Sequence, residues 1–426
     1  MKDSSKLKAI FFAATGCHEN FMDSALVRAR FGDMDGFREC ESFEEADIIV
    51  IMGCSVHQFM EDQTRELIHY INEHKSRNAE VVVLGCISKV RPEFAPRDGI
   101  GRQISMSIDN ILDFENRGDE IEINCPYDRK VLDSVEALSQ RRKVFFREFY
   151  TREERSVLHT LTDPGFRLLF YLLKRYKDYL ESRIDVFNDK TYCIKISTGC
   201  LGQCSYCSIK LSRGSVKSKS LDNILAEFQR GLDLGYKHFA LLGTDIGDFG
   251  RDMGMDLCDL LEKMVSIDKD FKIRLRNVNP RWLIPNWLRF KPILETGKIS
   301  YIQSPIQSGN NRILGLMKRG YNAEDFLACT REIRLRYPSV VLKTQIMVGF
   351  PTETETEFLE SINIVNSAIF DYADVFRYTK RPRTPASLME PEVPDDVIMR
   401  RHRKILFRSL FNQPWRKMQA IYHLNT

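Results

Sequence analysis

Residues 193–210 read CIKISTGCLGQCSYCSIK, and this stretch decides how the rest of the chain is interpreted. The β-rich run CIKIST leads directly into Cys200, Cys204 and Cys207, which have the spacing CxxxCxxC. Three thiolates on one tight loop can bind three irons of a 4Fe-4S cluster and leave the fourth iron without a protein ligand. The alternatives are a zinc knuckle or three buried thiols. A structural zinc prefers four protein ligands, and only Cys193 lies nearby, so the spacing favours the cluster.

The chain after this loop alternates short apolar runs with helical stretches. Six such runs lie between residues 193 and 379, namely CIKIST, KHFALLG, FKIRLRN, ISYIQSPI, VVLKTQIMVGF and DYADVFRYT. This alternation predicts an α/β fold with a parallel sheet, and six units fit a partial (β/α)6 barrel. Barrels of this kind bind ligands at the carboxyl ends of their strands. Residues that directly follow the six runs are therefore candidates for the site.

The N-terminal part has a shorter βα pattern of its own. The runs AIFFAATG, ADIIVIMG and EVVVLG lie between residues 9 and 85 and predict a small parallel sheet covered on both faces. Each run ends in Gly followed at once by Cys: Gly16-Cys17, Gly53-Cys54 and Gly85-Cys86. The carboxyl ends of parallel strands share one edge of the sheet, so Cys17, Cys54 and Cys86 are expected to converge there. Three buried structural cysteines are the alternative.

The composition is that of a globular enzyme. With 426 residues, 43% hydrophobic and 29% charged, the chain is not disordered, collagen-like or a coiled coil. A net charge of +4 excludes a polyelectrolyte built for nucleic acid, so any basic site must be local. The chain has no apolar run of about 18 residues, so we expect no membrane segment and a cytoplasmic location. In a reducing compartment, 11 cysteines indicate metal or redox chemistry before disulfides.

Two segments fall outside the βα pattern. Residues 126–190 contain 11 aromatic, 14 basic and 11 acidic side chains, and residues 166–184 have the pattern of an amphipathic helix. Residues 395–426 have the pattern of a basic helix opened by Pro394-Asp395 and broken at Pro414. We therefore expect four parts, which are an N-terminal parallel-sheet domain over 1–125, a helical insertion or linker over 126–190, the partial barrel over 191–394 and a basic helical segment over 395–426.

The cysteine spacing before a partial barrel resembles the radical S-adenosylmethionine superfamily, and further motifs resemble the methylthiotransferase family within it. These motifs are TGCHENFMDS at 15–24, GCSV at 53–56, LGC at 84–86, SRG at 212–214, LLGTDIGDFG at 241–250, RLRNVNP at 274–280, PIQSGNNRIL at 305–314, KRGY at 318–321, VGFPTET at 348–354 and YTKRPRTPA at 378–386. The resemblance extends from Lys8 to about Met389, apart from the central insertion.

The resemblance implies two 4Fe-4S clusters and S-adenosylmethionine as cofactors. One cluster would be held by Cys200, Cys204 and Cys207, and its open iron would bind the methionine part of the cofactor and cleave it to a 5′-deoxyadenosyl radical. An auxiliary cluster on Cys17, Cys54 and Cys86 would carry the sulfur to be inserted. The residues that the resemblance implies for cofactor binding are Tyr206, Gln307, Ser308, Gly349, Phe350, Pro351, Arg213 and Arg319, with Arg381, Asp245 and Asp248 as further candidates.

The chain also departs from the family pattern. Gln345 stands where the family usually has Asp, Thr352 where Gly is common, and Arg383 where Gly normally follows the Arg-Pro motif. Only 32 residues follow Pro394. Because their pattern is helical, the small all-β TRAM domain that binds substrate in tRNA-modifying members is expected to be missing.

These observations lead us to expect a methylthiotransferase that inserts a methylthio group at an unactivated C–H bond. The expected substrate is a peptide or protein, such as a ribosomally made natural-product precursor, because of the missing TRAM domain. A modified adenosine in transfer RNA is the alternative, and so is sulfur insertion without methylation. A non-catalytic iron-sulfur redox sensor is a distant third reading. An electron donor such as flavodoxin or ferredoxin is the other expected partner.

Overall fold

The computed structural model describes residues 7–32, 36–56, 58–91, 104–105, 191–367 and 369–412. The chain divides into two compact units, residues 1–153 with 208–214, and residues 154–207 with 215–426. Each unit is built on a parallel sheet with helices, which confirms the expected α/β class. The insertion 126–190 lies outside the described residues, so the expected domain boundaries stay predictions.

The first unit contains a five-stranded sheet in the order β2-β1-β3-β4-β5, with every pair parallel. Three of its strands are the predicted apolar runs, whereas the short β2 and β5 were not predicted. The described elements are β1 (Lys8–Ala14), α1 (His18–Gly32), β2 (Phe37–Glu39), η2 (Phe43–Glu45), β3 (Ile48–Met52), α2 (Gln58–His74), β4 (Glu80–Leu84), α3 (Cys86–Val90) and β5 (Ile104–Ser105).

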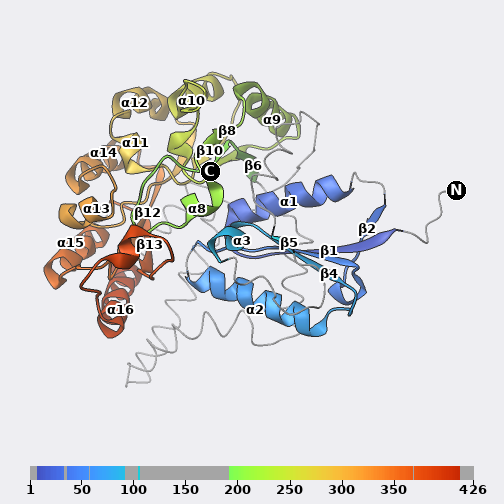
Figure 1. Cartoon of the computed structure of the whole chain (residues 1–426). Helices are drawn as coiled ribbons and strands as arrows, with labels where there is room; N and C mark the ends of the chain where they lie inside the picture. The colour runs from blue at the N-terminus through green and yellow to red at the C-terminus, as the bar shows by residue number, and fades with distance from the viewer. Residues whose placement is uncertain are drawn as a thin grey trace. The chain divides into compact units, whose positions relative to one another are not determined.

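The central strands are apolar throughout because both of their faces are covered. In β1, Phe11 and Ala13 belong to a core with Leu67 and Ile71 of α2. Phe12, on the opposite face of the same strand, packs in a second core with Val27 of α1 and other buried residues. Figure 1 shows the two helices on opposite faces of this sheet.

The second unit contains six parallel strands in the order β13-β12-β11-β10-β9-β6, which confirms the predicted partial barrel. Its strands and its small hairpin are β6 (Thr191–Lys195), β7 (Ser197–Thr198), β8 (Lys217–Ser218), β9 (His238–Leu242), β10 (Lys272–Leu275), β11 (Ile299–Gln303), β12 (Val341–Val348) and β13 (Tyr372–Arg377). The helices are α8 (Ile209–Arg213), α9 (Leu221–Asp233), η4 (Ile246–Asp248), α10 (Leu257–Val265), α11 (Pro280–Leu283), α12 (Trp287–Glu295), α13 (Asn311–Leu316), α14 (Ala323–Arg336), α15 (Glu355–Asn366), η5 (Pro385–Leu388) and α16 (Asp395–Asn412), of which α8 belongs to the first unit.

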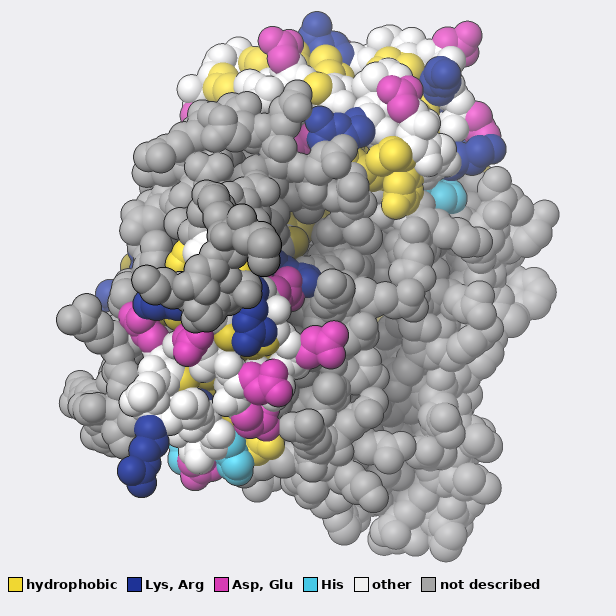
Figure 2. Space-filling model, turned by 90° about the vertical axis from the view of Figure 1, so that its right-hand side faces the viewer, with side chains coloured by type: hydrophobic (Ala, Val, Ile, Leu, Met, Phe, Trp, Pro, Cys, Tyr) yellow, Lys and Arg dark blue, Asp and Glu magenta, His cyan; other side chains and the backbone are white. Residues whose placement is uncertain are grey.

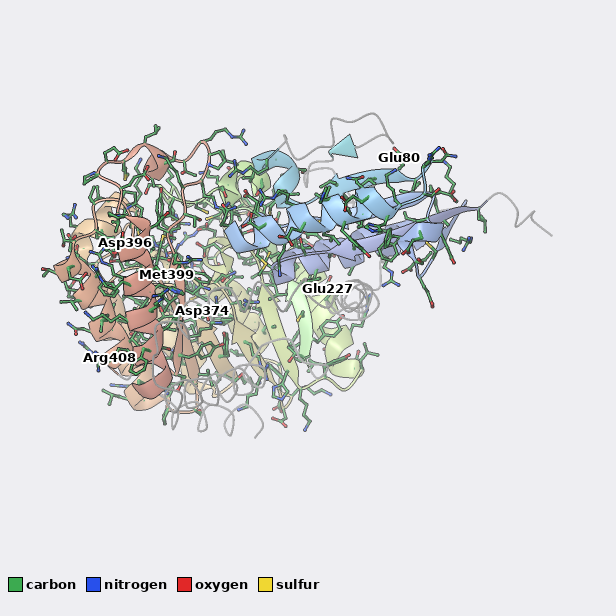
Figure 3. The ribbon with its side chains drawn as sticks, turned by 90° about the horizontal axis from the view of Figure 1, so that it is seen from below. Glu80, Glu227, Asp374, Asp396, Met399 and Arg408 are labelled. Atoms are coloured by element: carbon green, nitrogen blue, oxygen red, sulfur yellow. The ribbon has the colours of Figure 1, made fainter. Side chains whose placement is uncertain are left out.

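Helix α16 covers the edge of the six-stranded sheet at β13. Figure 3 shows Asp396, Met399 and Arg408 following one another along this helix. The ring nitrogen Nε2 of His402 lies 3.2 Å from the carbonyl oxygen of Val375 in β13. A covered edge strand cannot pair with another chain, so α16 protects this side of the sheet. Among the described residues, no helix combines the length and the apolar character that a membrane span requires.

Candidate functional site

The three cysteines that follow strands of the first unit come together. Cys17, Cys54 and Cys86 follow β1, β3 and β4, which are neighbours in the sheet. The thiols of Cys17 and Cys54 are joined by a hydrogen bond, and Cys86 interacts electrostatically with each of them. The convergence expected from the strand ends therefore occurs, and three thiols at one sheet edge suit a metal cluster.

Glycine before each cysteine lets these strand ends approach one another closely. A Cβ atom on Gly16 would lie 2.0 Å from Cβ of Cys54, and one on Gly85 would lie 2.5 Å from the carbonyl oxygen of Gly53. Both glycines also have positive φ angles, which disfavour residues with a side chain. Thr64 of α2 fixes the middle strand end, because its hydroxyl accepts the backbone N–H of Cys54 at 3.1 Å.

The surroundings of the three thiols favour a thiolate at Cys17. The hydrogen bond from Cys54 is the main cause that lowers the pKa of Cys17 to about 7, and Arg213 contributes to it through its charge. The same hydrogen bond and burial raise the pKa of Cys54, and burial raises that of Cys86. Since a thiolate is the form that binds metal, Cys17 is the ligand most readily available at neutral pH.

The loop with Cys200, Cys204 and Cys207 belongs to the second unit and is anchored from two directions. The backbone N–H of Ser205 donates to the carbonyl oxygen of Met317 at 3.1 Å, and its own carbonyl accepts the N–H of Ala386 at 2.8 Å. The Ser205 hydroxyl also donates to the carbonyl oxygen of Leu316 at 2.7 Å. Segments that follow β11 and β13 thus hold the cysteine loop over the barrel.

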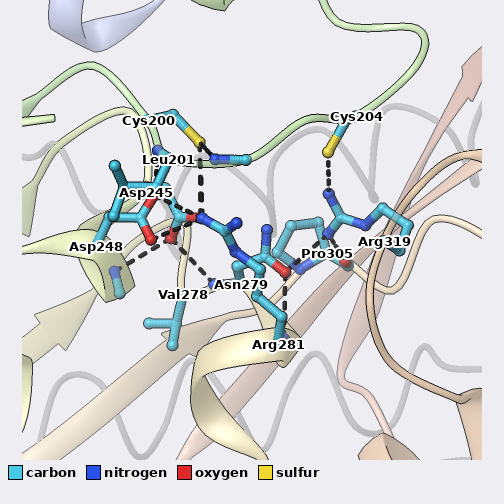
Figure 4. A network of polar contacts seen from close by, with 12 residues as sticks. Cys200, Leu201, Cys204, Asp245, Asp248, Val278, Asn279, Arg281, Pro305 and Arg319 are labelled. Carbon is cyan, nitrogen blue, oxygen red and sulfur yellow. Dashed lines mark hydrogen bonds and ion pairs between the residues drawn. The ribbon is translucent and has the colours of Figure 1, made fainter. Parts of the chain in front are cut away.

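Two buried carboxylates lie beside Cys200 and share one guanidinium (Figure 4). Asp248 accepts the backbone N–H of Leu201 at 2.7 Å, and both of its oxygens lie 2.6 Å from Nη2 of Arg281. Asp245 lies 3.5 Å from the same nitrogen and 4.0 Å from Sγ of Cys200. Burial and the charge of Asp248 raise the pKa of Asp245 to about 6. Among the described residues, the charged side chains beside Cys200 therefore carry more negative than positive charge.

Sequence reasoning missed Arg281, which lies at the start of α11. The Asn279-Pro280 pair before it is a typical helix start, and Asn279 does cap this helix by accepting the N–H of Arg281. That signal predicts the helix. It does not predict that the first turn carries an arginine to the cysteine loop, since Cys200 is distant in the sequence.

Arg319 braces the loop from the other side, and Figure 4 shows its guanidinium between Cys204 and Pro305. It donates to Sγ of Cys204 at 3.2 Å and to the carbonyl oxygen of Pro305 at 2.9 Å. The remaining donors reach the hydroxyls of Tyr206 and Tyr321 and the side chain of Asn279. A guanidinium has five N–H donors and all have partners here, so the role supported for Arg319 is to hold the loop. Its expected contact with the cofactor carboxylate stays a prediction.

Other residues expected at the cofactor lie around the same loop. Tyr206 contacts the ring of Phe350 edge-on, with ring centroids 6.5 Å apart. Gln307 has a φ of 73° and is 8% exposed, and its Oε1 atom has no hydrogen-bond partner among the described residues. A buried acceptor on strained backbone suits a bound ligand. Ser308 instead accepts the N–H of Asn310 at 3.2 Å, within the turn that leads into α13.

The turn Gly349-Phe350-Pro351 has a structural partner that the sequence did not indicate. A Cβ atom on Gly349 would lie 2.4 Å from Cγ1 of Ile398 in α16. Glycine is therefore needed here for the packing of α16, whether or not a ligand approaches the turn. Arg381, another candidate, is 3% exposed, and its carbonyl oxygen accepts the Thr384 hydroxyl.

The same turn supports a prediction about pH. Burial raises the pKa of Glu353 from 4.5 to about 7, although the Gly349 N–H and Arg401 oppose the shift. The folded protein then binds the proton of the Glu353 carboxyl more tightly than the unfolded chain does. The protonated carboxyl therefore stabilises the fold fully below about pH 4.5, and this stabilisation is lost as the pH rises through 7. We expect this group to lower the free energy of unfolding by roughly 3 kcal/mol over that window. Urea titrations at several pH values measure it.

In the Glu353→Gln variant, the downward slope of the free energy of unfolding between pH 4.5 and 7 should disappear. Glu355 provides the matched control, because it also pairs with Arg401 but its pKa is lowered. Glu355→Gln should keep the slope between pH 4.5 and 7, and an equal loss in both variants would contradict the assignment.

Arg213 is another residue that the resemblance implies for cofactor binding. It belongs to the first unit, where it is 2% exposed and pairs with Asp23 at 3.0 Å. Side-chain hydrogen bonds from Ser212 and Arg213 reach Cys86. Arg213 is thus a neighbour of the three gathered thiols, and its expected contact with the cofactor carboxylate stays a prediction.

Two segments of the chain match known families. Residues 194–365 match the Radical SAM superfamily, and residues 9–99 match a family described as uncharacterized protein family UPF0004. The first match covers most of the six-stranded sheet with its cysteine loop. The second contains Cys17, Cys54 and Cys86.

Curated relatives cover nearly the whole chain. A probable threonylcarbamoyladenosine tRNA methylthiotransferase of Archaeoglobus fulgidus is 29% identical over 92% of this chain and 80% of the relative. A tRNA-2-methylthio-N(6)-dimethylallyladenosine synthase of Aquifex aeolicus is 26% identical over 94% of this chain and 82% of the relative. Among solved structures, the radical S-adenosylmethionine methyltransferase TsrM of Kitasatospora setae has a TM-score of 0.55 at 11% identity over 89% of this chain and 75% of its own. At that identity the likeness concerns the fold alone.

Proposed function

This chain belongs to the radical S-adenosylmethionine methylthiotransferase family, and from that premise we propose that it transfers a methylthio group to a modified adenosine of transfer RNA. As a member of this family it is an enzyme whose cofactors are two 4Fe-4S clusters and S-adenosylmethionine. The observation that carries the proposal is the meeting of Cys17, Cys54 and Cys86 at one edge of the first sheet. A second set of gathered thiols is what sulfur transfer needs in addition to the CxxxCxxC loop.

We assign Cys200, Cys204 and Cys207 to the cluster that binds S-adenosylmethionine, and Cys17, Cys54 and Cys86 to the auxiliary cluster. When bound, these groups supply a radical that removes hydrogen from an unactivated C–H bond and the sulfur that replaces it. The protein's own contribution is to bind, orient and exclude water. Arg281 and Arg319 fix the CxxxCxxC loop through their contacts with Cys200 and Cys204.

The residues around Cys200 fit the methionine part of the cofactor. Asp245 and Asp248 are 4% and 5% exposed and share Arg281, so they offer the charge that a cationic ammonium group requires. The buried Oε1 of Gln307 offers an acceptor for a hydroxyl or an ammonium group. Phe350, with Tyr206 and Tyr378 packed edge-on against it, offers an apolar wall for the adenine.

The expectation of a peptide substrate has no support among the relatives. Both curated relatives described above are named for transfer RNA, which favours the alternative over the main reading of the sequence. The expectation of a peptide rested on the helical pattern of the C-terminal segment, and that pattern does not indicate which surface of the protein meets the substrate.

The test is a reaction of the anaerobically reconstituted enzyme with S-adenosylmethionine, a reductant and transfer RNA. Two RNAs are compared, one carrying N6-threonylcarbamoyladenosine and one carrying N6-dimethylallyladenosine, with a cellular peptide pool as the third arm. We expect nucleoside mass spectrometry to find one added methylthio group in an RNA arm. Product in the peptide arm alone would overturn the substrate proposal, and an added sulfur without methyl would identify the thiolation alternative.

A transfer RNA needs cations near the barrel mouth, since phosphate contacts supply most of the affinity. On the face shown in Figure 2, Lys and Arg side chains are mixed with Asp and Glu, so a basic contact has to be local. Lys318, Lys380 and Arg383 are exposed on the segments that follow β11 and β13. Apolar neighbours on these segments, Met317 and Tyr378, share one core cluster.

We expect Lys318→Glu to weaken the binding of transfer RNA by about tenfold at low salt. The slope of the logarithm of affinity against the logarithm of salt concentration should fall by the amount that corresponds to about one phosphate contact. Fluorescence anisotropy at several salt concentrations measures both. Lys269→Glu is the charge-matched control, because Lys269 is exposed just before β10, where the strand begins rather than ends. Equal weakening in both variants would mean that only the overall charge matters.

Two further expectations remain parts of this proposal. The low-potential electron would come from a small protein donor such as flavodoxin or ferredoxin. A transfer RNA substrate would place the enzyme in the cytoplasm.

A further inference from the structure

Arg213 is a buried cation that the reaction scheme above does not use. It ends α8, six residues after Cys207, yet it is packed within the first unit. Its guanidinium lies 3.0 Å from Oδ2 of Asp23 and 3.6 Å from Oε1 of Glu19, and it donates to Oδ1 of Asn20 at 3.3 Å. Three residues of one turn of α1 therefore hold this side chain in a fixed place.

The place is next to the gathered thiols. Side-chain hydrogen bonds from Ser212 and Arg213 reach Cys86, and the charge of Arg213 acts on both Cys17 and Cys86. The turn of α1 that holds the guanidinium directly follows Cys17 in the chain. Arg213 thus contacts one of the three thiols and is held by the residues that follow another.

Burying a charge is costly unless the site uses it or neutralises it completely. Asp23 is fully buried, so the pair brings two charges out of water together. An apolar pair would fill the same volume without that cost. Thiolates that bind a cluster add negative charge at this point, and a fixed guanidinium is the group that offsets it.

We propose that Arg213 is a positioning residue for the auxiliary cluster, and that its charge and its hydrogen bond to Cys86 set the reduction potential of that cluster. The inference rests on the proposed assignment of this cluster to Cys17, Cys54 and Cys86. Reduction adds negative charge to the cluster. A nearby cation favours the reduced state, and hydrogen bonds to the ligand sulfurs act in the same direction.

The other cysteine loop has a comparable arginine of its own. Arg319 is 4% exposed and donates to Sγ of Cys204 at 3.2 Å. In the described part of the chain, each set of cysteines therefore has a buried guanidinium that donates to one of its sulfurs. The guanidinium of the first unit is that of Arg213, on the segment that follows Cys207.

The test measures the auxiliary cluster alone. In a background where Cys200, Cys204 and Cys207 are changed to Ala, only the auxiliary cluster is expected to assemble, and its midpoint potential can be followed by paramagnetic resonance during redox titration. We expect Arg213→Gln to lower the ratio of reduced to oxidised cluster by about tenfold at a fixed potential, about 59 mV for a one-electron couple. Arg213→Lys, which keeps the charge, should recover at least half of that shift.

Asp23→Asn provides the variant of opposite sign. It removes the anion beside Arg213 and keeps an oxygen that accepts its hydrogen bond, so the cluster should become easier to reduce. A general loosening of the site would shift both variants in the same direction. If Arg213→Gln fails to fold, as thermal unfolding of the apoprotein would reveal, Arg213→Lys and Asp23→Asn decide the question.

Several results would overturn the inference. Unchanged potentials in Arg213→Gln would do so, as would shifts of one sign in Arg213→Gln and Asp23→Asn, or iron loss without a shift of potential. If the background protein assembles no cluster at all, the cysteine assignment under the proposed function fails instead. The two failures are therefore distinguishable.

Discussion

Changing Cys17, Cys54 and Cys86 together to Ala should leave the reconstituted protein with about four irons in place of about eight. The three thiols converge at the ends of β1, β3 and β4, and no other cysteine outside the CxxxCxxC loop is expected to bind a cluster. The variant should still cleave S-adenosylmethionine, because Cys200, Cys204 and Cys207 are untouched. It should form no methylthio product. Iron and sulfide analysis, together with detection of 5′-deoxyadenosine, checks both halves.

The matched control changes three other buried cysteines, Cys40, Cys258 and Cys329, to Ala. These side chains pack as small hydrophobes, so the control should retain all iron and lose about 1 kcal/mol of stability per site. Full iron content in the first variant would refute the auxiliary cluster. Iron loss of the same size in the control would show that the measurement reports folding.

Changing Gly16 to Ala should disrupt the auxiliary site without removing any ligand. The new Cβ atom would lie 2.0 Å from Cβ and 2.6 Å from Sγ of Cys54, and the φ of 99° adds backbone strain. Overpacking and strain together are expected to cost about 3 kcal/mol or more. We expect the auxiliary irons to fall by more than half, while cofactor cleavage continues.

Gly36 is the control for the backbone part of this effect. Its φ is 108°, but a Cβ atom there would meet nothing within 4 Å. Gly36→Ala should therefore cost only about 1 kcal/mol and leave the iron content unchanged. Denaturant titration and iron analysis of the two variants separate strain from steric conflict. An intact auxiliary cluster in Gly16→Ala would mean that the strand ends can move apart.

Much of the fold could be predicted because its signals are local. The runs AIFFAATG, ADIIVIMG and EVVVLG became β1, β3 and β4, and their continuous apolar character reflects helices on both faces. The short strand β2 carries no such signal, since two of its three residues are exposed. It forms because β1 offers an unpaired edge.

The candidate site was predictable only in part. Cysteines were found from their spacing, and their grouping followed from the rule that parallel strands end at one edge. The roles given to the arginines could not be checked from the sequence, because a guanidinium reaches its partners through space. Arg319, for example, was expected at the cofactor, and only the structure shows that its five donors contact the cysteine loop and the segments around it.

The amino-acid pattern by itself therefore determined the βα alternation, the two sets of three cysteines and the family they indicate. The strands, the CxxxCxxC spacing and each Gly-Cys strand ending depend on residues within a few positions of one another, where backbone geometry allows few outcomes. The rule that parallel strands end at one edge then groups Cys17, Cys54 and Cys86. Tertiary structure alone decided that Arg213 lies beside Cys86 and that Ile398 of α16 occupies the space left by Gly349. Such contacts join segments far apart in the chain, and their energies depend on burial and distance, which no local pattern contains.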